Sequence, residues 1–193
     1  MDDDKAKPLR GVGSGGTALK YSFAPFVDSR SRVLILGTLP GEESLRLQQY
    51  YGHPRNHFWP LIAALAGEAL PAEFAARKQM LQRNGIALWD VLESAERIGS
   101  PDSAIRNPTA NSFEKLFDLF RNIEAIAFNG QKAQALFRRY VLKPRIVMEA
   151  RFAMFELPSS SPLHTIPFEE KLVVWRERLG PYLRARRQNL RAK

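Results

Sequence analysis

Cysteine is absent from this chain of 193 residues, and histidine occurs only three times. Without a thiol, the chain can form no disulfide bond and can bind neither zinc nor an iron–sulfur cluster through thiolates. No apolar run approaches the roughly 20 residues of a membrane span, so we expect a soluble protein. The opening segment Met1–Lys7 resembles a tag, and no basic and apolar leader accompanies it. We therefore expect a cytoplasmic protein.

Acidic residues are fewer than basic ones. The chain has 20 Asp and Glu against 29 Lys and Arg, which gives a formal net charge of +9. Such an excess suits a polyanionic partner. Part of it lies in a basic C-terminal tail, residues 185–193, where a solvated end is the simpler explanation. Charge alone is therefore weak support for nucleic-acid binding.

The order of elements predicts an α/β fold. Apolar runs predict strands at residues 32–37, 86–89, 123–128 and 151–157. Apolar residues at helical spacing predict helices at residues 42–49, 57–66, 71–83, 113–120, 131–140 and 168–184. Because strands and helices alternate, we expect a three-layer α/β/α sandwich around a central four-stranded parallel sheet. A ligand site is then expected outside the carboxyl ends of the strands.

The chain is long enough for one domain. We expect residues 1–20 to form a flexible N-terminal segment, residues 21–184 a single domain, and residues 185–193 the basic tail. We also expect a monomer, because a bulky polymer would have to reach the open edge of the sheet.

Two loops should meet at that edge, Gly37–Gly41 after the first strand and Leu157–Pro162 after the last. Their glycines, prolines and hydroxyls let backbone N–H groups approach a phosphate or a base closely. Either loop alone could be a simple turn. Neither carries the glycine pattern of a dinucleotide site or the Lys-Ser/Thr ending of a P-loop, although a nucleotide-binding α/β enzyme remains an alternative.

The segment Tyr50–Trp59 (YYGHPRNHFW) is the most informative one. Aromatic rings suit base stacking, arginine suits phosphate, and an amide can read a base edge or hold a water. The alternatives are structural: Phe58 and Trp59 could be core residues, and Asn56 could cap the helix that follows.

Five strings in collinear order resemble the hypoxanthine/uracil-DNA glycosylase family of the uracil-DNA glycosylase superfamily. They are GTLPGEESL (Gly37–Leu45), YYGHPRNHFW (Tyr50–Trp59), GIALWDVL (Gly85–Leu92), FNGQKA (Phe128–Ala133) and LPSSSP (Leu157–Pro162). The resemblance spans nearly all of residues 32–175. It implies a DNA-repair enzyme that hydrolyses the N-glycosidic bond of a flipped deaminated base, hypoxanthine or uracil, without a metal or an organic cofactor.

The resemblance also shows what is missing. Classical uracil-DNA glycosylases have Asp or Asn before the proline of the first loop, where this chain has Leu39. Their histidine at the head of the last loop is absent too, since Leu157 and Pro158 precede Ser159. In the similar hypoxanthine-removing family the asparagine of the PRN string takes over, which makes Asn56 the expected catalytic residue. Because an amide is hardly basic, Asn56 would orient the attacking water through its carbonyl oxygen.

The remaining site residues are expected in two groups. Those expected to contact the base are Gly37, Thr38, Leu39, Tyr51, Phe58, Trp89 and Asp90. Those expected to contact the DNA backbone are Pro40, Arg55, Ser159, Ser160 and Ser161. Asp90 has a structural alternative as a loop-capping carboxylate. The expected partner is duplex DNA with a deaminated base, with single-stranded DNA left open, in the nucleoid of a prokaryotic cytoplasm.

Two further alternatives concern other classes of protein and site. A non-catalytic module that binds lesions or distorted DNA could use the same fold, because the acid and the histidine of classical enzymes are missing. His53, His57 and His164 could hold a metal, but Pro54 between the first two argues against a shared helical face, so we expect no metal site.

Overall fold

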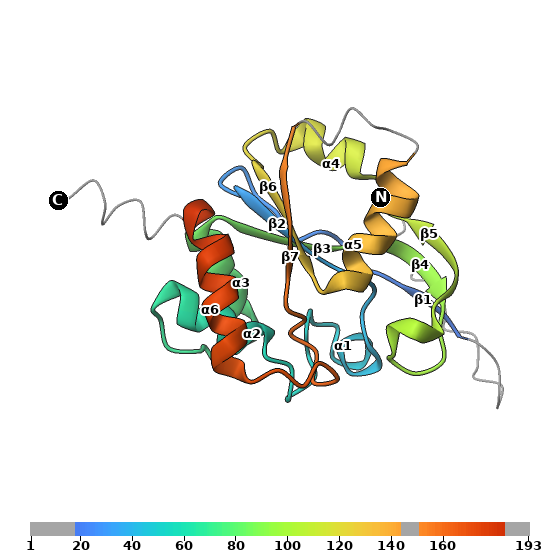
Figure 1. Ribbon diagram of the computed structural model, residues 1–193, viewed down its shortest axis with the longest axis horizontal. Helices are drawn as coiled ribbons and strands as arrows, with labels where there is room; N and C mark the ends of the chain where they lie inside the picture. The colour runs from blue at the N-terminus through green and yellow to red at the C-terminus, as the bar shows by residue number, and fades with distance from the viewer. Residues whose placement is uncertain (1–17, 144–150, 184–193) are drawn as a thin grey trace, which may run out of the picture.

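A computed structural model describes residues 18–143 and 151–183 of the chain (Figure 1). Its centre is a sheet of four parallel strands in the order β3-β2-β6-β7. These strands are β2 (Val33–Gly37), β3 (Ile86–Asp90), β6 (Ala125–Asn129) and β7 (Ala153–Leu157). The predicted three-layer α/β/α fold with four parallel strands is confirmed.

Strand β2 is buried along its whole length, because it lies between β3 and β6 and is covered on both faces. A continuous apolar run is typical of such a strand. In register, Gly37 lies beside Asp90, and Leu36 lies beside Phe128. The carboxyl ends of β2, β3 and β6 therefore reach one edge of the sheet together.

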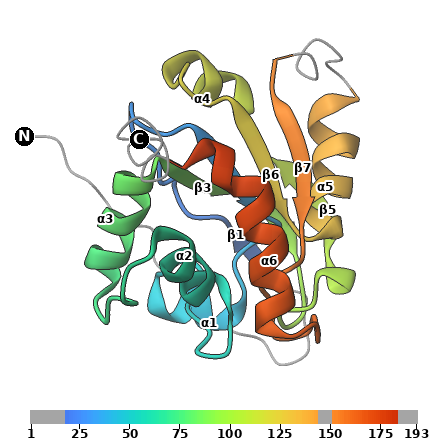
Figure 2. The ribbon, with the colours of Figure 1, turned by 60° about the vertical axis from the view of Figure 1, so that its left-hand side comes forward.

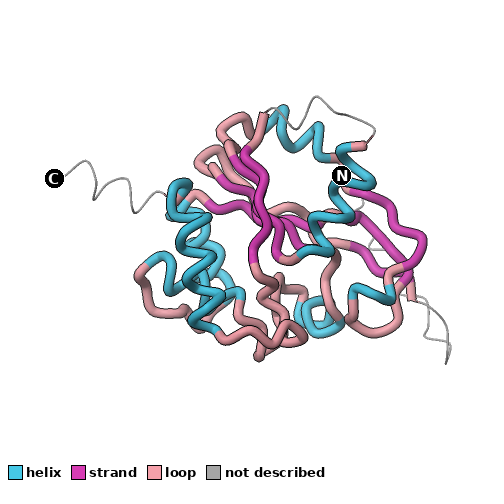
Figure 3. Tube along the Cα trace, viewed as in Figure 1, coloured by secondary structure: helices cyan, strands magenta, loops and turns pink. Residues whose placement is uncertain are grey.

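Helices cover both faces of the sheet, as Figures 2 and 3 show. The helices are α1 (Glu42–Leu47), α2 (Phe58–Ala66), α3 (Phe74–Asn84), α4 (Phe113–Leu119), α5 (Gln131–Phe137) and α6 (Phe168–Leu179). Val33 and Ile35 face one apolar core with α2, α3 and α6. Leu34 and Leu36 face a second core with α4 and α5. No helix in the described part of the chain is long and apolar enough to cross a membrane.

Two helices end differently from the prediction. Helix α6 stops at Leu179 rather than near residue 184, because Gly180 and Pro181 follow and Pro181 has no N–H to continue the ladder. Gly180–Tyr182 forms a short 3-10 turn, η4. Helix α5 continues beyond Phe137 as a π-helical turn, η2 (Arg138–Leu142).

A second, antiparallel sheet was not predicted. It has the order β1-β4-β5 and consists of β1 (Leu19–Tyr21), β4 (Leu92–Glu96) and β5 (Arg106–Ala110). Residues 96–111 lie outside every strand and helix predicted from the sequence and were therefore expected to be a loop, but residues 106–110 form β5, which pairs with β4. Between them, Asp102–Ala104 forms a 3-10 turn, η1.

This sheet also corrects the expected boundary of the domain. Leu19 and Lys20, assigned to a flexible segment, belong to β1 and pair with Glu96 and Ala95 of β4. Lys20 is buried, and its ammonium group donates to the carbonyl oxygen of Gly99 at 2.6 Å. The folded part thus begins by residue 19, while residues 1–17 and the tail at 185–193 lie outside the described residues.

Substitution of Ile35 tests how closely the central core is packed. Its side chain is fully buried in β2, so Ile35→Ala should lower the free energy of unfolding by about 2–5 kcal/mol. The matched exposed isoleucine, Ile98, should tolerate Ile98→Ala within about 0.5 kcal/mol. Urea denaturation measures both. Equal losses in the two variants would contradict the placement of β2 at the centre.

Candidate active site

The carboxyl edge of the parallel sheet brings together loops that are far apart in the sequence, in the lower part of Figure 1. Ser160, after β7, is fully buried. Its backbone N–H donates to Asn129 Oδ1, and its hydroxyl accepts from Asn129 Nδ2, both at 2.8 Å. The carbonyl oxygen of Ser160 accepts the N–H of His57 at 3.0 Å. This Ser160 junction connects the ends of β6 and β7 to the segment before α2.

A second meeting point lies at Gly37, the last residue of β2. A Cβ atom added there would lie 2.6 Å from Asp90 Oδ1 and 3.2 Å from the Tyr51 hydroxyl. Glycine is therefore required for space, because any side chain would collide with the carboxylate. Three segments, the end of β2, the end of β3 and the loop before α2, thus place an amide backbone, a carboxyl and a phenol side by side.

Asp90 is the most unusual group at this edge. It is 4% exposed, and its Oδ2 has no hydrogen-bond partner among the described residues. Burial raises its pKa to about 7; Arg97 opposes this rise, and Asp102 adds to it. A carboxyl with a pKa near neutrality is about half protonated at neutral pH, and its protonated form can donate a hydrogen bond. Among the described residues no backbone N–H donates to this carboxyl, so the structural alternative, a loop-capping carboxylate, is not seen.

Asn56 lies two residues before α2 and is partly exposed. His57 occupies the N-cap position, but Asn56 Oδ1 accepts the backbone N–H of Phe58, the first residue of α2, at 2.9 Å and so satisfies one free N–H at the start of the helix. This contact fixes the plane of the amide. It leaves the second lone pair of Oδ1 available, since a carbonyl oxygen has two. Capping and orientation of a water are therefore compatible roles for this side chain.

Of the three aromatic residues expected to contact the base, Tyr51 lies at the site, whereas Phe58 and Trp89 pack in the core. Tyr51 stacks on Phe58 with ring centroids 3.8 Å apart and an angle of 13°. Phe58 is fully buried, so the expectation that it contacts the base is wrong for this structure: Tyr51 covers its face. Tyr51 itself has a left-handed backbone, with φ of 53°. Burial first, and the nearby Asp90 second, raise the pKa of its hydroxyl.

Trp89 was also expected to contact the base, and this is wrong too. Side chains alternate between the two faces of a sheet, so Trp89 and Asp90 lie on opposite faces of β3. Trp89 packs in the core that contains α4 and α5. Its ring centroid lies 5.1 Å from that of Phe113, and its N–H donates to the carbonyl oxygen of Phe23 at 3.1 Å.

The loop after β2 is held by the β4–β5 hairpin. Thr38 donates its hydroxyl to Asp102 Oδ1 at 2.7 Å, and the carbonyl oxygens of Leu39 and Pro40 accept from the guanidinium of Arg97. The side chain of Leu39 is buried in the core. Of these three loop residues, Thr38 and Leu39 have a backbone N–H that can serve a ligand, because Pro40 has none and its carbonyl oxygen accepts from Arg97.

Among the residues expected to contact the DNA backbone, Ser160 is a correction. Its side chain is fully buried, and its hydroxyl is held by the amide of Asn129, so it does not reach the surface where a phosphate would lie. Ser159 and Ser161 are partly exposed and bond each other, from Ser161 N–H to Ser159 Oγ at 3.2 Å. Arg55 is exposed and has no ion pair among the described residues, as a phosphate-binding arginine would need.

The three histidines do not form a metal site. Within the described residues no group of three or more His, Cys, Asp or Glu side chains could hold a metal ion. His57 packs its ring edge-on to Phe168 at 5.5 Å, and the Nδ1 of His53 accepts the N–H of Arg55 at 3.1 Å.

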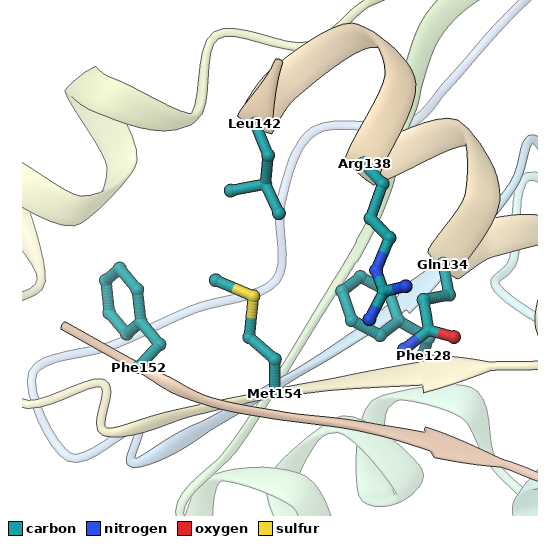
Figure 4. A pocket seen from close by; sticks show the side chains of 6 residues that line it. All are labelled: Phe128, Gln134, Arg138, Leu142, Phe152 and Met154. Carbon is teal, nitrogen blue, oxygen red and sulfur yellow. The ribbon is translucent and has the colours of Figure 1, made fainter. Parts of the chain in front are cut away.

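A hollow of about 310 Å³ lies elsewhere, between α5 with η2 and strands β6 and β7 (Figure 4). It is lined by Phe128, Gln134, Arg138, Leu142, Phe152 and Met154. It includes none of the residues that meet at Gly37 or at the Ser160 junction. The chemistry of the carboxyl edge therefore does not take place in this hollow.

Sequence reasoning missed four residues at or near the edge. Asn129 lay in a recognised string but received no role, and Arg97 and Asp102 lay in a stretch expected to be a loop. Leu163, two residues after Ser161, is 73% exposed. An apolar residue in a polar loop was the available signal for Leu163.

Comparisons with known proteins agree with this geometry. Residues 24–179 match the family model described as the uracil DNA glycosylase superfamily. A hypoxanthine DNA glycosylase of Methanosarcina barkeri is 42% identical over 115 residues, which are 59% of this chain and 73% of the relative. One of Methanosarcina acetivorans is 42% identical over 117 residues, 60% of this chain and 73% of the relative.

A solved structure is similar as well. The solution NMR structure of a Methanosarcina acetivorans protein assigned to the uracil DNA glycosylases superposes with a TM-score of 0.69 at 33% identity. The match covers 83% of this chain and 98% of that one.

The fold and the polar cluster at its carboxyl edge define an α/β enzyme that acts on a ligand held at that edge. The chain belongs to the uracil DNA glycosylase superfamily. It is a DNA glycosylase, which hydrolyses the N-glycosidic bond of a damaged base, and DNA is its substrate. The family favours this function over a nucleotide-binding enzyme or a non-catalytic binding module.

Asp90 makes the stability of the protein depend on pH. Between its ordinary pKa near 4 and the raised value of about 7, the unfolded chain loses the proton while the folded protein keeps it. Stability therefore falls as the pH rises through this window. The Asp90→Asn variant lacks this effect, so its free energy of unfolding relative to the native protein should rise by roughly 3–5 kcal/mol from about pH 4 to about pH 8.

Urea denaturation across this pH range measures the difference. Asp28 is the matched control: burial opposes its ionisation, but hydrogen bonds from Arg30 outweigh it and lower the pKa. Asp28→Asn should therefore lose stability relative to the native protein as the pH rises. A pH-independent difference for Asp90→Asn would show that Asp90 ionises normally.

Proposed function

We propose that this enzyme removes hypoxanthine from DNA, with uracil as a second substrate. Both named relatives are hypoxanthine DNA glycosylases. The observation that carries the proposal is the meeting of Asp90, Tyr51 and Gly37 at the carboxyl edge, next to the segment that contains Asn56. In this arrangement Asp90 can hydrogen-bond the edge of a base, the ring of Tyr51 can stack on it, and the amide of Asn56 can bind a water molecule.

Asp90 supplies the base recognition. Hypoxanthine presents an N–H donor beside a carbonyl acceptor, and a neutral carboxyl presents a matching acceptor and donor. Uracil has the same N–H and carbonyl pair. An ionised carboxylate could accept from the N–H but would face the carbonyl oxygen unfavourably. The raised pKa of about 7 keeps Asp90 in the matching form in neutral and mildly acidic solution.

The base must leave the duplex before it can reach this edge, because its glycosidic bond is otherwise inaccessible. Mismatched, deaminated bases flip at the least cost, so damage is selected partly before contact. Tyr51, stacked on Phe58, gives the flipped base a rigid ring to pack against. Backbone N–H groups of the Gly37–Gly41 loop and the acid of Asp90 then stabilise negative charge on the departing base.

Asn56 handles the attacking water. Its amide is fixed by the hydrogen bond to Phe58 N–H, and Oδ1 orients a water towards C1′ of the sugar as positive charge develops there. The water oxygen bonds to C1′ while the bond to the base breaks and its electron pair leaves with the base; the water releases one proton to solvent, and the departing base takes up one proton from solvent. The products are the free base and an abasic sugar.

Leu163 and the exposed polar groups hold the duplex. Leu163 stands out of the loop after β7, where an apolar side chain can fill the space left by the flipped base. Arg55, Ser159 and Ser161 contact the neighbouring phosphates. A monomer acting on duplex DNA in a prokaryotic cytoplasm fits this open edge.

Asn56 variants separate catalysis from capping. Asn56→Ala should lower the single-turnover rate of hypoxanthine release by about 10²-fold or more, because the water loses its orientation. Asn56→Ser keeps a good capping oxygen and should keep the melting temperature, but the shorter side chain should not restore the rate. Retention of the native rate in Asn56→Ser would limit Asn56 to capping.

Leu163→Ala tests the filling of the duplex. Flipping a base out of a duplex costs a few kcal/mol of lost pairing and stacking, whereas a base in a single strand has no pairing to lose. The variant should therefore lose activity on duplex inosine but not on single-stranded inosine. Release rates on the two substrates measure this. Val173→Ala, at another exposed apolar side chain, should leave both rates unchanged. An equal loss on both substrates for Leu163→Ala would refute the role.

A further inference from the structure

One buried side chain, that of Arg97, holds the loop after β2 in place. Arg97, directly after β4, is 1% exposed. Its guanidinium donates to the carbonyl oxygen of Leu39 at 3.3 Å and to that of Pro40. It also lies 3.4 Å from Asp102 Oδ1, the atom that accepts the hydroxyl of Thr38. Three consecutive residues of the loop are therefore fixed by Arg97 and Asp102.

The direction of these bonds matters for the site. Across a trans peptide unit, the carbonyl oxygen of one residue and the N–H group of the next point in opposite directions. Because the carbonyl oxygen of Pro40 is held towards Arg97, the N–H group of Gly41 is held away from it, while Pro40 itself has no N–H. A fork that donates to two carbonyl oxygens at once is available to arginine but not to lysine.

The same pair of charges acts on Asp90. Arg97 lowers the pKa of the Asp90 carboxyl, and Asp102 raises it. Tyr51 and Tyr50, the other titratable groups against Asp90, have hydroxyl pKa values raised chiefly by burial. They therefore stay neutral. Arg97 and Asp102 bond the loop that follows Gly37, the residue paired with Asp90, and they are the charges that act on this carboxyl.

We propose that Arg97 and Asp102 are positioning residues for base release, which hold the Thr38–Pro40 loop through bonds to two carbonyl oxygens and one hydroxyl. The role in base release depends on the function proposed above. The effect on Asp90 does not, because it can be measured without DNA.

Four variants and one matched control test this proposal. Arg97→Met removes the fork and the charge, Arg97→Lys keeps the charge alone, and Asp102→Asn keeps an acceptor for Thr38 without the charge. Arg32→Met is the control, because Arg32 is also a buried arginine that bonds a carboxylate, Glu124, and a carbonyl oxygen, that of Tyr182, at the opposite end of β2. Asp90→Asn identifies the titration that belongs to Asp90.

Single-turnover release of hypoxanthine is measured against pH. The pH midpoint at which the Asp90 carboxyl titrates is measured by ¹³C NMR without DNA. The midpoint should rise in Arg97→Met, fall in Asp102→Asn, and stay in Arg97→Lys and Arg32→Met. The rate at saturating enzyme should fall about 10-fold or more in both Arg97 variants, with DNA affinity changed far less. Arg32→Met should lose melting temperature alone.

The outcomes separate the possible failures. If neither Arg97→Met nor Asp102→Asn moves the midpoint, and the folded variants release base like Arg32→Met, the two residues are merely structural and the proposal is wrong. If the native protein releases no base while the midpoints still move in opposite directions, the proposed substrate fails but the control of Asp90 stands. If Arg97→Met does not fold, Arg97→Lys and Asp102→Asn decide alone.

Discussion

The two hydrogen bonds between the amide of Asn129 and Ser160 hold the working edge of this enzyme together. They join the ends of β6 and β7, and Ser160 then accepts the N–H of His57. Asn56 precedes His57, so its position follows from a contact between segments about a hundred residues apart. A partly buried amide that uses both its donor and its acceptor is specific about geometry, because the loss of either bond leaves a polar group of the junction unpaired.

The same edge contains a buried carboxyl, that of Asp90, which lowers the stability of the fold. A buried carboxyl with an unpaired oxygen, such as that of Asp90, lowers stability when it ionises. Gly37 leaves just enough room for it, and Arg97 moderates it from behind. Groups that are held out of their ordinary protonation state cluster where chemistry is done. The charge state of Asp90, rather than a strong general base, distinguishes this site, since Leu39 replaces the acid of classical family members.

The sequence predicted the parallel sheet because each strand is a continuous apolar run between helical patterns, as in RVLILG of β2. It could not predict β4 and β5. Their segments, LESAE and RNPTA, lack apolar alternation, and Pro108 suits only an edge strand, which β5 is. Their pairing depends on partners such as Glu96 and Arg106 that the pattern does not connect. At the site, the recognised strings placed Asn56, Tyr51 and Asp90 at the carboxyl edge, where the structure also has them, but they did not show that Phe58 and Trp89 pack in the two cores or that Ser160 bonds Asn129.

The most direct measurement is the recovery of free base from a duplex that contains one deoxyinosine, quantified by mass spectrometry beside the abasic sites formed. A glycosylase that reads hypoxanthine at Asp90 should release one equivalent of free hypoxanthine per abasic site, and no adenine from the same duplex with deoxyadenosine. Tight binding of the inosine duplex without any free base, at enzyme in excess and over the full pH range, would contradict it.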